Sequence, residues 1–240
     1  MSALLRSAAA AVAVGAALAG LALAPGAAAQ SAVLVYPGME IRQNATMCTL
    51  GFVDMAKRIG YSAGHCGAEG PVTDRSGRFI GVVTTSRDNT PDGAVVRTDQ
   101  VIADYQTIQL AGGVTLSDFM PGGRQLIADP AVALGPGQPV CHLGVVTGES
   151  CGSVERMNNG WFTMQNGVIS QKGDSGGPVY TLAADGRAVI VGLFNSTWGH
   201  LPAAVNWDAT NQLLRQDMLA AGAADATNDT VINVAATATD

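Results

Sequence analysis

Short apolar segments separated by turn-forming residues run through most of this chain. Glycine, proline, asparagine and aspartate interrupt the apolar runs before most of them reach the length of a helix. Regularly spaced short strands of this kind are typical of β-barrels and β-sandwiches. The predicted strands are 32–36, 46–52, 58–62, 79–85, 93–97 and 102–110 in a first set, and 140–146, 152–156, 161–164, 177–181 and 188–194 in a second.

The two sets of strands are joined by a glycine- and proline-rich stretch, residues 111–137, which we expect to cross the surface between two lobes. Helical spacing of apolar residues occurs only near the end of the chain. It predicts one helix at about 208–221, with Asp208 as its N-cap. Residues 223–240 are rich in Ala, Thr, Asn and Asp and predict a mobile tail.

Residues 1–29 have the pattern of a secretion signal. Arg6 is the one charged residue of this segment, an apolar run follows to Ala24, and Pro25-Gly26 and three alanines come next. This pattern predicts cleavage after Ala29. The alternative is a membrane anchor, since the run approaches the length of a membrane span, but the small residues at its end favour removal. We therefore expect an exported chain with no membrane association after the signal is removed.

Charge and cysteine content limit the classes of partner. The formal net charge is −6 and Lys and Arg form no cluster, which argues against binding to nucleic acid or to anionic membranes. Four cysteines in an exported chain predict two disulfides, for which three pairings exist. The alternative is a zinc site that uses cysteines and His65. The chain has no C-x-x-C pair and an oxidising compartment disfavours free thiolates, so no metal or cofactor is expected.

The segment Gly173-Asp174-Ser175-Gly176-Gly177-Pro178 places a serine hydroxyl among residues small enough for backbone N–H groups to point at a reacting carbonyl oxygen. Serine becomes a nucleophile when a base takes its proton and a third group orients that base. His65, in a Gly-His-Cys context, is the candidate base. Asp92 precedes the apolar residues 93–96, which would bury its carboxylate, whereas Asp88 lies in a polar turn. The predicted catalytic residues are therefore His65, Asp92 and Ser175.

The order His, Asp, Ser and these motifs resemble the chymotrypsin-like serine proteases, in particular the secreted bacterial streptogrisin and α-lytic protease branch. The resemblance covers about residues 37–192 and includes the segments 48–52, 141–151 and 191–195. It implies an all-β fold of two packed six-stranded antiparallel Greek-key barrels with a C-terminal helix. The implied protease domain is 30–222, with a first barrel at about 32–110, a linker at about 111–137 and a second barrel at about 138–205.

The resemblance also implies disulfides Cys48–Cys66 and Cys141–Cys151. The implied function is a secreted bacterial serine endopeptidase, a monomer outside the cell or on the exterior of the cell envelope, that cleaves protein or peptide substrates through an acyl-enzyme. The N–H groups of Gly173 and Ser175 would form the oxyanion hole. Two alternatives remain: a weakly active or inactive protease-fold binding protein, and an esterase that uses the same triad.

Asp174 requires a partner, because the family buries this carboxylate beside the oxyanion loop and an isolated buried charge is costly. Bacterial relatives supply an arginine just after the first cysteine of the small loop, where this chain has His142. We expect His142 to pair with Asp174 and to make the loop sensitive to pH. The alternative is a solvated His142, with Arg156 or Arg124 as the partner.

The substrate pocket is predicted from the same resemblance. Trypsin-like enzymes carry an aspartate where Ile169 falls, so a neutral or apolar substrate residue is expected before the scissile bond. Asn195 replaces the serine that is usual at its position. The residues predicted to bind substrate are Ile169, Ser170, Lys172, Phe194, Asn195 and Ser196.

Overall fold

A computed structural model of the chain describes residues 32–90 and 96–221. The predicted signal segment 1–29, the predicted tail 223–240 and Asp92 lie outside these residues. The described chain is built of β-strands, one 3-10 turn and one helical segment, so the predicted all-β class is confirmed. The helix at 207–221 does not have the length and apolar character that crossing a membrane requires, and no other helix of the described residues has them.

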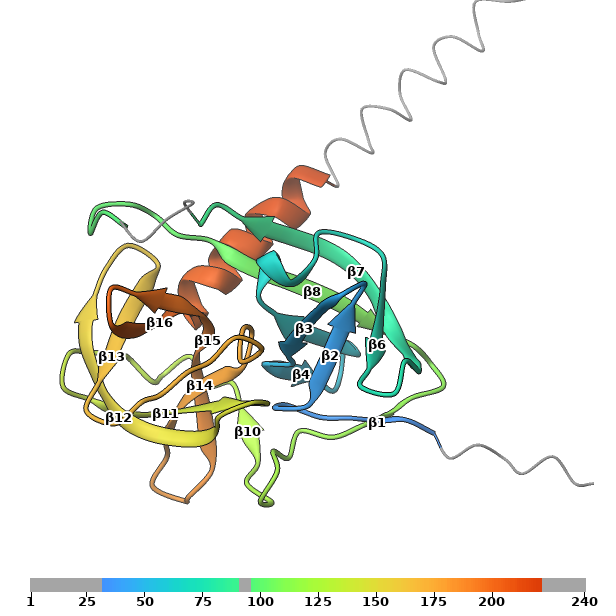
Figure 1. The fold of residues 1–240 in the computed structure, drawn as a ribbon, viewed down its shortest axis with the longest axis horizontal. Helices are drawn as coiled ribbons and strands as arrows, with labels where there is room; N and C mark the ends of the chain where they lie inside the picture. Colours follow the sequence, from blue (N-terminus) through green and yellow to red (C-terminus); the bar gives the residue numbers. More distant parts are fainter. Residues whose placement is uncertain (1–31, 91–95, 222–240) are drawn as a thin grey trace, which may run out of the picture. The chain divides into compact units, whose positions relative to one another are not determined.

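The first half of the fold is a curled antiparallel sheet with the order β3-β2-β6-β7-β8-β5-β4 (Figure 1). Its two end strands, β3 and β4, are consecutive parts of one segment. Between them the chain changes partner: the Leu50 N–H donates to Met39 O and the Gly51 N–H to Tyr61 O. The strands are β2 Glu40–Gln43, β3 Thr46–Thr49, β4 Phe52–Asp54, β5 Ile59–Ser62, β6 Pro71–Asp74, β7 Phe79–Asp88 and β8 Asp104–Leu110.

The second half is a closed barrel. The sheet order β15-β14-β11-β12-β13-β16 is completed by pairing of β15 with β16, so the two-barrel architecture is confirmed. In Figure 1 these strands, coloured yellow to orange, stand beside the blue and green strands of the first half. The strands are β11 Pro139–Gly144, β12 Gly148–Met157, β13 Trp161–Gln165, β14 Pro178–Leu182, β15 Ala188–Trp198 and β16 Leu201–Asn206.

The stretch between the two halves contains two short strands. β9, Thr115–Leu116, pairs in parallel with β1, Leu34–Val35, and β10, Leu126–Ile127, pairs in parallel with β15. The predicted linker is thus attached to both halves by backbone hydrogen bonds.

The predicted C-terminal helix is present at 207–221. Its N-cap is Asn206, whose Oδ1 accepts the Ala209 N–H at 3.0 Å, so the expectation of Asp208 as cap is wrong. The helix buries Trp207 and Leu214 in the core.

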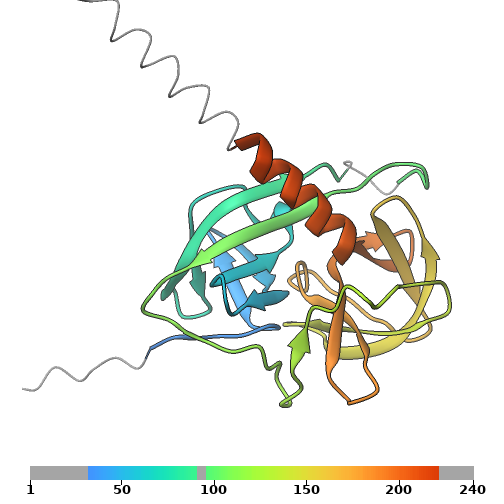
Figure 2. The ribbon, with the colours of Figure 1, turned by 180° about the vertical axis from the view of Figure 1, so that it is seen from behind.

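Further along the helix, Asp217 attaches it to the first half of the fold. Its carboxylate accepts the Tyr105 hydroxyl of β8 and pairs with Arg87 of β7 at 3.2 Å. Figure 2 shows the helix, at the red end of the colour scale, lying against these two strands. The helix therefore spans from the end of β16 in the second barrel to β7 and β8 of the first half.

Both predicted disulfides are confirmed, Cys48–Cys66 and Cys141–Cys151. The first joins β3 to the 3-10 turn η1, Gly64–Cys66, and the second joins directly opposed residues of β11 and β12. Each contributes about 3 kcal/mol, chiefly by restricting the unfolded chain.

The sequence prediction missed the two short strands of the linker, β9 and β10, and three further strands, β2, β6 and β16. The predicted strand 93–97 lies largely outside the described residues, and its described part, Val96 and Arg97, is not in a strand.

Candidate active site

The 3-10 turn η1 places His65 at the junction of the two halves. Gly64 fits there because a Cβ would overlap the carbonyl oxygen of Arg87 and press on that of Tyr105. The adjacent Cys66 is tied to β3 by its disulfide. The turn is thus held on both sides of His65.

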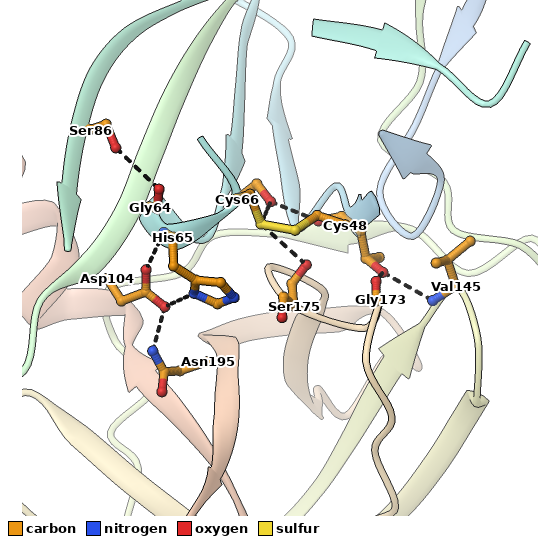
Figure 3. Close-up of a disulfide and its surroundings, with 12 residues drawn as sticks. Cys48, Gly64, His65, Cys66, Ser86, Asp104, Val145, Gly173, Ser175 and Asn195 are labelled. Atoms are coloured by element: carbon orange, nitrogen blue, oxygen red, sulfur yellow. Dashed lines mark hydrogen bonds and ion pairs between the residues drawn. A yellow bond between two sulfur atoms is a disulfide. The ribbon is translucent and has the colours of Figure 1, made fainter. Parts of the chain in front are cut away.

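His65 is oriented by the carboxylate of Asp104. The His65 N–H donates to Asp104 Oδ1 at 2.9 Å, and His65 Nδ1 lies 2.8 Å from Asp104 Oδ2 (Figure 3). Asp104, the first residue of β8, is fully buried. Asn195 Nδ2 also donates to Asp104 Oδ2, and it contacts Thr90 Oγ1 at 3.2 Å. The carboxylate therefore has neutral donors as well as the imidazole.

The structure gives His65 a carboxylate partner that the sequence prediction did not name. Asp92 was expected to hold His65, but it lies outside the described residues, and the structure gives the contact with His65 Nδ1 to Asp104. A signal for Asp104 was available in the sequence. It lies within the predicted strand 102–110, where an aspartate that becomes buried needs a partner because burial of an unpaired carboxylate is costly.

Two opposing effects act on the pKa of His65. Burial lowers it, while the hydrogen bond and negative charge of Asp104, together with the charge of Asp88, raise it. The net effect is a pKa above the ordinary value for histidine. The imidazolium form is thus stabilised by the neighbouring carboxylate.

Ser175 lies in the loop between β13 and β14, and two backbone hydrogen bonds hold this loop. Ser175 O accepts the Thr49 N–H at 2.8 Å, and the Gly176 N–H donates to Phe194 O at 2.7 Å. In Figure 3 the His65 ring extends from Asp104 toward Ser175. No hydrogen bond joins His65 to Ser175 Oγ, a geometry common in enzymes without bound substrate.

Among residues 173–177 of this loop, two N–H groups remain available to a ligand. Those of Asp174, Gly176 and Gly177 donate to main-chain carbonyls. For the N–H groups of Gly173 and Ser175 there is no acceptor within the described ranges 32–90 and 96–221. Gly173 has φ +107°, a conformation that disfavours any residue with a Cβ.

The predicted pair of His142 and Asp174 is not formed. Asp174 is fully buried, but its carboxylate is held by N–H groups and a hydroxyl of the surrounding turns. His142 is also buried, and its Nδ1 lies 3.3 Å from Ile169 O. Burial lowers the pKa of His142, and the negative charge of Asp174 opposes this only in part. The expected ion pair is therefore wrong, and the alternative of a solvated His142 is wrong too. The remaining candidates, Arg156 and Arg124, form no ion pair with Asp174 either.

The residues predicted to bind substrate fall into two groups. Ser170 Oγ is 3.1 Å from Thr197 Oγ1, which joins the loop before Ser175 to the end of β15. Ile169 is 55% exposed and so does not form the floor of a closed pocket. Lys172 is exposed and Ser196 is partly exposed.

Phe194 and Asn195 are buried. The Phe194 ring packs on His142, with ring centroids 4.6 Å apart, and Asn195 turns to Asp104. Asn195 was expected to line the substrate pocket, but its side chain contacts Asp104, the carboxylate that orients His65.

Two clusters in the described chain contain three potential metal-ligating residues each: Cys48, His65 and Cys66, and Cys141, Glu149 and Cys151. In both clusters the cysteine sulfurs are joined as disulfides. A disulfide offers no thiolate, so neither cluster fits a zinc ion.

Solved structures of other proteins show which known fold this chain has. Thermobifida fusca protease A aligns with a TM-score of 0.53 at 20% identity, covering 72% of this chain and 91% of that one. A glutamic acid specific serine protease aligns with a TM-score of 0.54 at 18% identity, covering 76% and 98%. A scabies mite inactivated protease paralogue aligns with a TM-score of 0.50 at 13% identity, covering 75% and 92%. The chain has the fold of the chymotrypsin-like serine proteases.

Close relatives in sequence come from Mycobacterium tuberculosis. The uncharacterized proteins Rv1815 and MT1863 are each 55% identical to this chain over 194 residues, which is 81% of this chain and 88% of theirs. The chain belongs to the family of these two proteins. No family model matches it.

Proposed function

We propose that this protein is an exported serine endopeptidase in which Ser175 is the nucleophile, His65 the general base and Asp104 the residue that orients His65. The observation that carries the proposal is the imidazole of His65, held at Nδ1 by a buried carboxylate and directed toward Ser175. With Nδ1 occupied by Asp104, the proton-accepting nitrogen is Nε2.

In the proposed reaction, Ser175 Oγ attacks the carbonyl carbon of the scissile peptide bond while its proton passes to His65 Nε2. The resulting imidazolium is stabilised by Asp104 and then gives the proton to the leaving amine. Water repeats the sequence on the acyl-enzyme and releases the acid. His65 alternates between base and acid, a role suited to a group that titrates near neutral pH.

The negative oxygen of each tetrahedral intermediate would be bound by the N–H groups of Gly173 and Ser175. Both lack an acceptor in the described part of the chain, whereas the neighbouring N–H groups of Asp174, Gly176 and Gly177 donate to main-chain carbonyls. Donors fixed before the reaction lower the barrier because they need no reorganisation during it.

The end of β15 supports an extended peptide as substrate. Its pairing with β14 ends at Leu193, and Ser196–Trp198 pair with β16 on one side, with no strand opposite them among the residues described. A peptide can add as a further strand to such an edge. Near the end of the strand is a hollow of about 330 Å³ with a mixed lining that includes Trp161 and Trp198 but also Glu155 and Arg156, and part of a bound peptide could enter it.

The bond between Ser170 and Thr197 bears on the residue before the scissile bond. The Ser170 and Thr197 hydroxyls lie between the two segments that carry the predicted substrate-binding residues. They narrow the space between these segments and bring no charge into it. A small neutral side chain fits this geometry best.

A second candidate is a protease-fold binding protein without significant activity. Two observations favour it: no hydrogen bond joins Ser175 to His65, and Ser170 contacts Thr197 where a substrate side chain is expected. The fold is compatible with both functions, because a fold by itself does not determine activity.

The two candidates are separated by reaction of the secreted full chain with a fluorophosphonate. In this reaction a bond forms between Ser175 Oγ and phosphorus, fluoride leaves, and His65 takes the hydroxyl proton. We expect a single labelled site, mapped by mass spectrometry to Ser175 and lost in Ser175→Ala. A folded protein that remains unlabelled would exclude the proposed enzyme. For a labelled protein, peptide and ester substrates offered in parallel separate an endopeptidase from an esterase.

A further inference from the structure

The carboxylate of Asp174, next to the proposed nucleophile, is held entirely by neutral groups. Oδ1 accepts the N–H groups of Val146 at 2.9 Å and Thr147 at 3.1 Å. Oδ2 accepts the Thr147 hydroxyl at 2.8 Å and the Gln171 N–H at 2.7 Å. In residues 32–90 and 96–221 no Lys, Arg or His side chain forms an ion pair with it.

These contacts are sufficient for a buried charge. A carboxylate has about four acceptor positions, and backbone N–H groups stabilise its ionised form. Asp174 is fully buried and would be costly in this position without them. Four hydrogen bonds leave no need for a cation.

The turn that supplies three of these donors is shaped around the carboxylate. It connects β11 to β12 and begins after Gly144, where a Cβ would overlap the Asp174 carboxylate. The Cys141–Cys151 disulfide joins the two strands that lead into the turn. The position of Asp174 is thus set by local backbone geometry.

The same turn is connected to the proposed oxyanion loop through Thr49. The Val145 N–H donates to Thr49 Oγ1 at 3.0 Å, and this hydroxyl donates to Gly173 O at 2.9 Å. The Thr49 N–H donates to Ser175 O at 2.8 Å. Asp174 is therefore flanked by two residues whose carbonyls are fixed on β3.

The buried side chain of His142 is influenced by the charge of Asp174 but does not replace these contacts. Its Nδ1 faces Ile169 O and its Nε2 is buried without a partner in the described part of the chain. The Phe194 ring covers it. A neutral imidazole fits this enclosure.

We propose that Thr147 is a positioning residue whose hydroxyl, with the N–H groups of its turn, holds Asp174 and so fixes the N–H groups of Gly173 and Ser175 for oxyanion binding without a cation. The proposal rests on the proposed function. It follows that activity does not depend on an ammonium group at a newly cut amino terminus.

The test compares Thr147→Val, which removes the hydroxyl and keeps the shape, with Thr147→Ser, which keeps the hydroxyl. The readout is the labelling of the secreted chain by a fluorophosphonate, resolved into the binding constant and the maximal labelling rate. We expect Thr147→Val to lower the maximal rate roughly 10- to 100-fold with little change in binding, as for loss of a hydrogen bond to a charge. Thr147→Ser is expected to stay within about threefold of the parent protein. Equal maximal rates in Thr147→Val and the parent protein would overturn the proposal.

Amide hydrogen exchange provides a readout that does not need activity. Peptides covering 171–177 are expected to exchange faster in Thr147→Val than in the parent protein, and at the parent rate in Thr147→Ser. If the parent protein is not labelled at all, the proposed function fails, and this exchange measurement alone decides whether Thr147 holds the loop. Unchanged exchange in Thr147→Val would overturn the proposal.

A chain with extra residues before its mature amino terminus tests the absence of a cationic partner. We expect its labelling rate to equal that of the parent protein. A tenfold or greater loss would show that a free terminus contributes and would overturn this part of the proposal.

Discussion

Replacing Asp104 by asparagine is expected to slow the labelling of Ser175 by a fluorophosphonate about ten-thousand-fold. The amide has nearly the shape of the carboxylate but no charge, so it neither stabilises the imidazolium of His65 nor holds its tautomer. The measurement is the second-order labelling rate of Asp104→Asn against that of the parent protein. Thermal unfolding of both proteins shows whether the variant is folded.

The same variant is expected to change the pH dependence of labelling. The neutral form of His65 is the active base, so the rate falls as the pH drops through the pKa of His65. Asp104 raises this pKa above the ordinary value, and its replacement is expected to move the acid limb to lower pH.

Two other aspartates provide the controls. Asp92→Asn and Asp88→Asn are expected to retain labelling within about tenfold, because the hydrogen bond to His65 Nδ1 comes from Asp104. The assignment would be contradicted by a large loss in Asp92→Asn together with normal labelling in Asp104→Asn.

Replacing Gly51 by alanine is expected to disturb the contact between the first sheet and the nucleophile loop. A Cβ at this position would overlap the carbonyl oxygen of Gly176 and the side chain of Leu193. The backbone oxygen cannot rotate away, so the loop must shift. We expect a loss of stability of about 1–3 kcal/mol and slower labelling of Ser175 by about 100-fold.

Gly113→Ala is the matched control, since nothing lies within 4 Å of the added Cβ. Its stability is expected to remain within about 0.5 kcal/mol of the parent protein. Denaturant unfolding and labelling rates of the two variants are compared. Normal labelling in Gly51→Ala would mean that the contact with Gly176 does not position the nucleophile.

Local motifs in the sequence were sufficient to predict some of the site. His65 and Ser175 lie in short segments whose neighbours restrict the backbone, so their surroundings could be inferred. The partner of His65 has no such motif. Asp92 was chosen from the apolar residues that follow it, whereas Asp104 is brought to His65 by the pairing of β5 with β8, which involves residues far apart in the sequence.

The environment of Asp174 could not be predicted for a related reason. Its hydrogen bonds come mostly from backbone N–H groups, and these depend on the conformation of the turn after β11 and not on residue type. The sequence offered the side chain of His142 as a partner for Asp174, but in the structure its Nδ1 lies against Ile169 O.

The strand prediction succeeded for long runs of β-branched residues and failed for short segments and for segments that contain proline. Runs rich in Val and Ile predicted β7 and β15, whereas β16 was missed although it is mostly apolar, and it contains Pro202. β2 alternates between buried and more exposed residues over only four positions, and β6 begins with proline. Such segments become strands because neighbouring strands pair with them, which is a property of the fold and not of local sequence.

Labelling rates in a double-mutant cycle of His65→Ala and Asp104→Asn give the most direct test that His65, Asp104 and Ser175 act as one unit. If Asp104 acts only through His65, the double variant is expected to label Ser175 no more slowly than His65→Ala alone, because the effects of residues that act together are not additive. The account would be contradicted if the rate losses of the two single variants multiplied in the double variant. It would also be contradicted if His65→Ala were labelled at the rate of the parent protein.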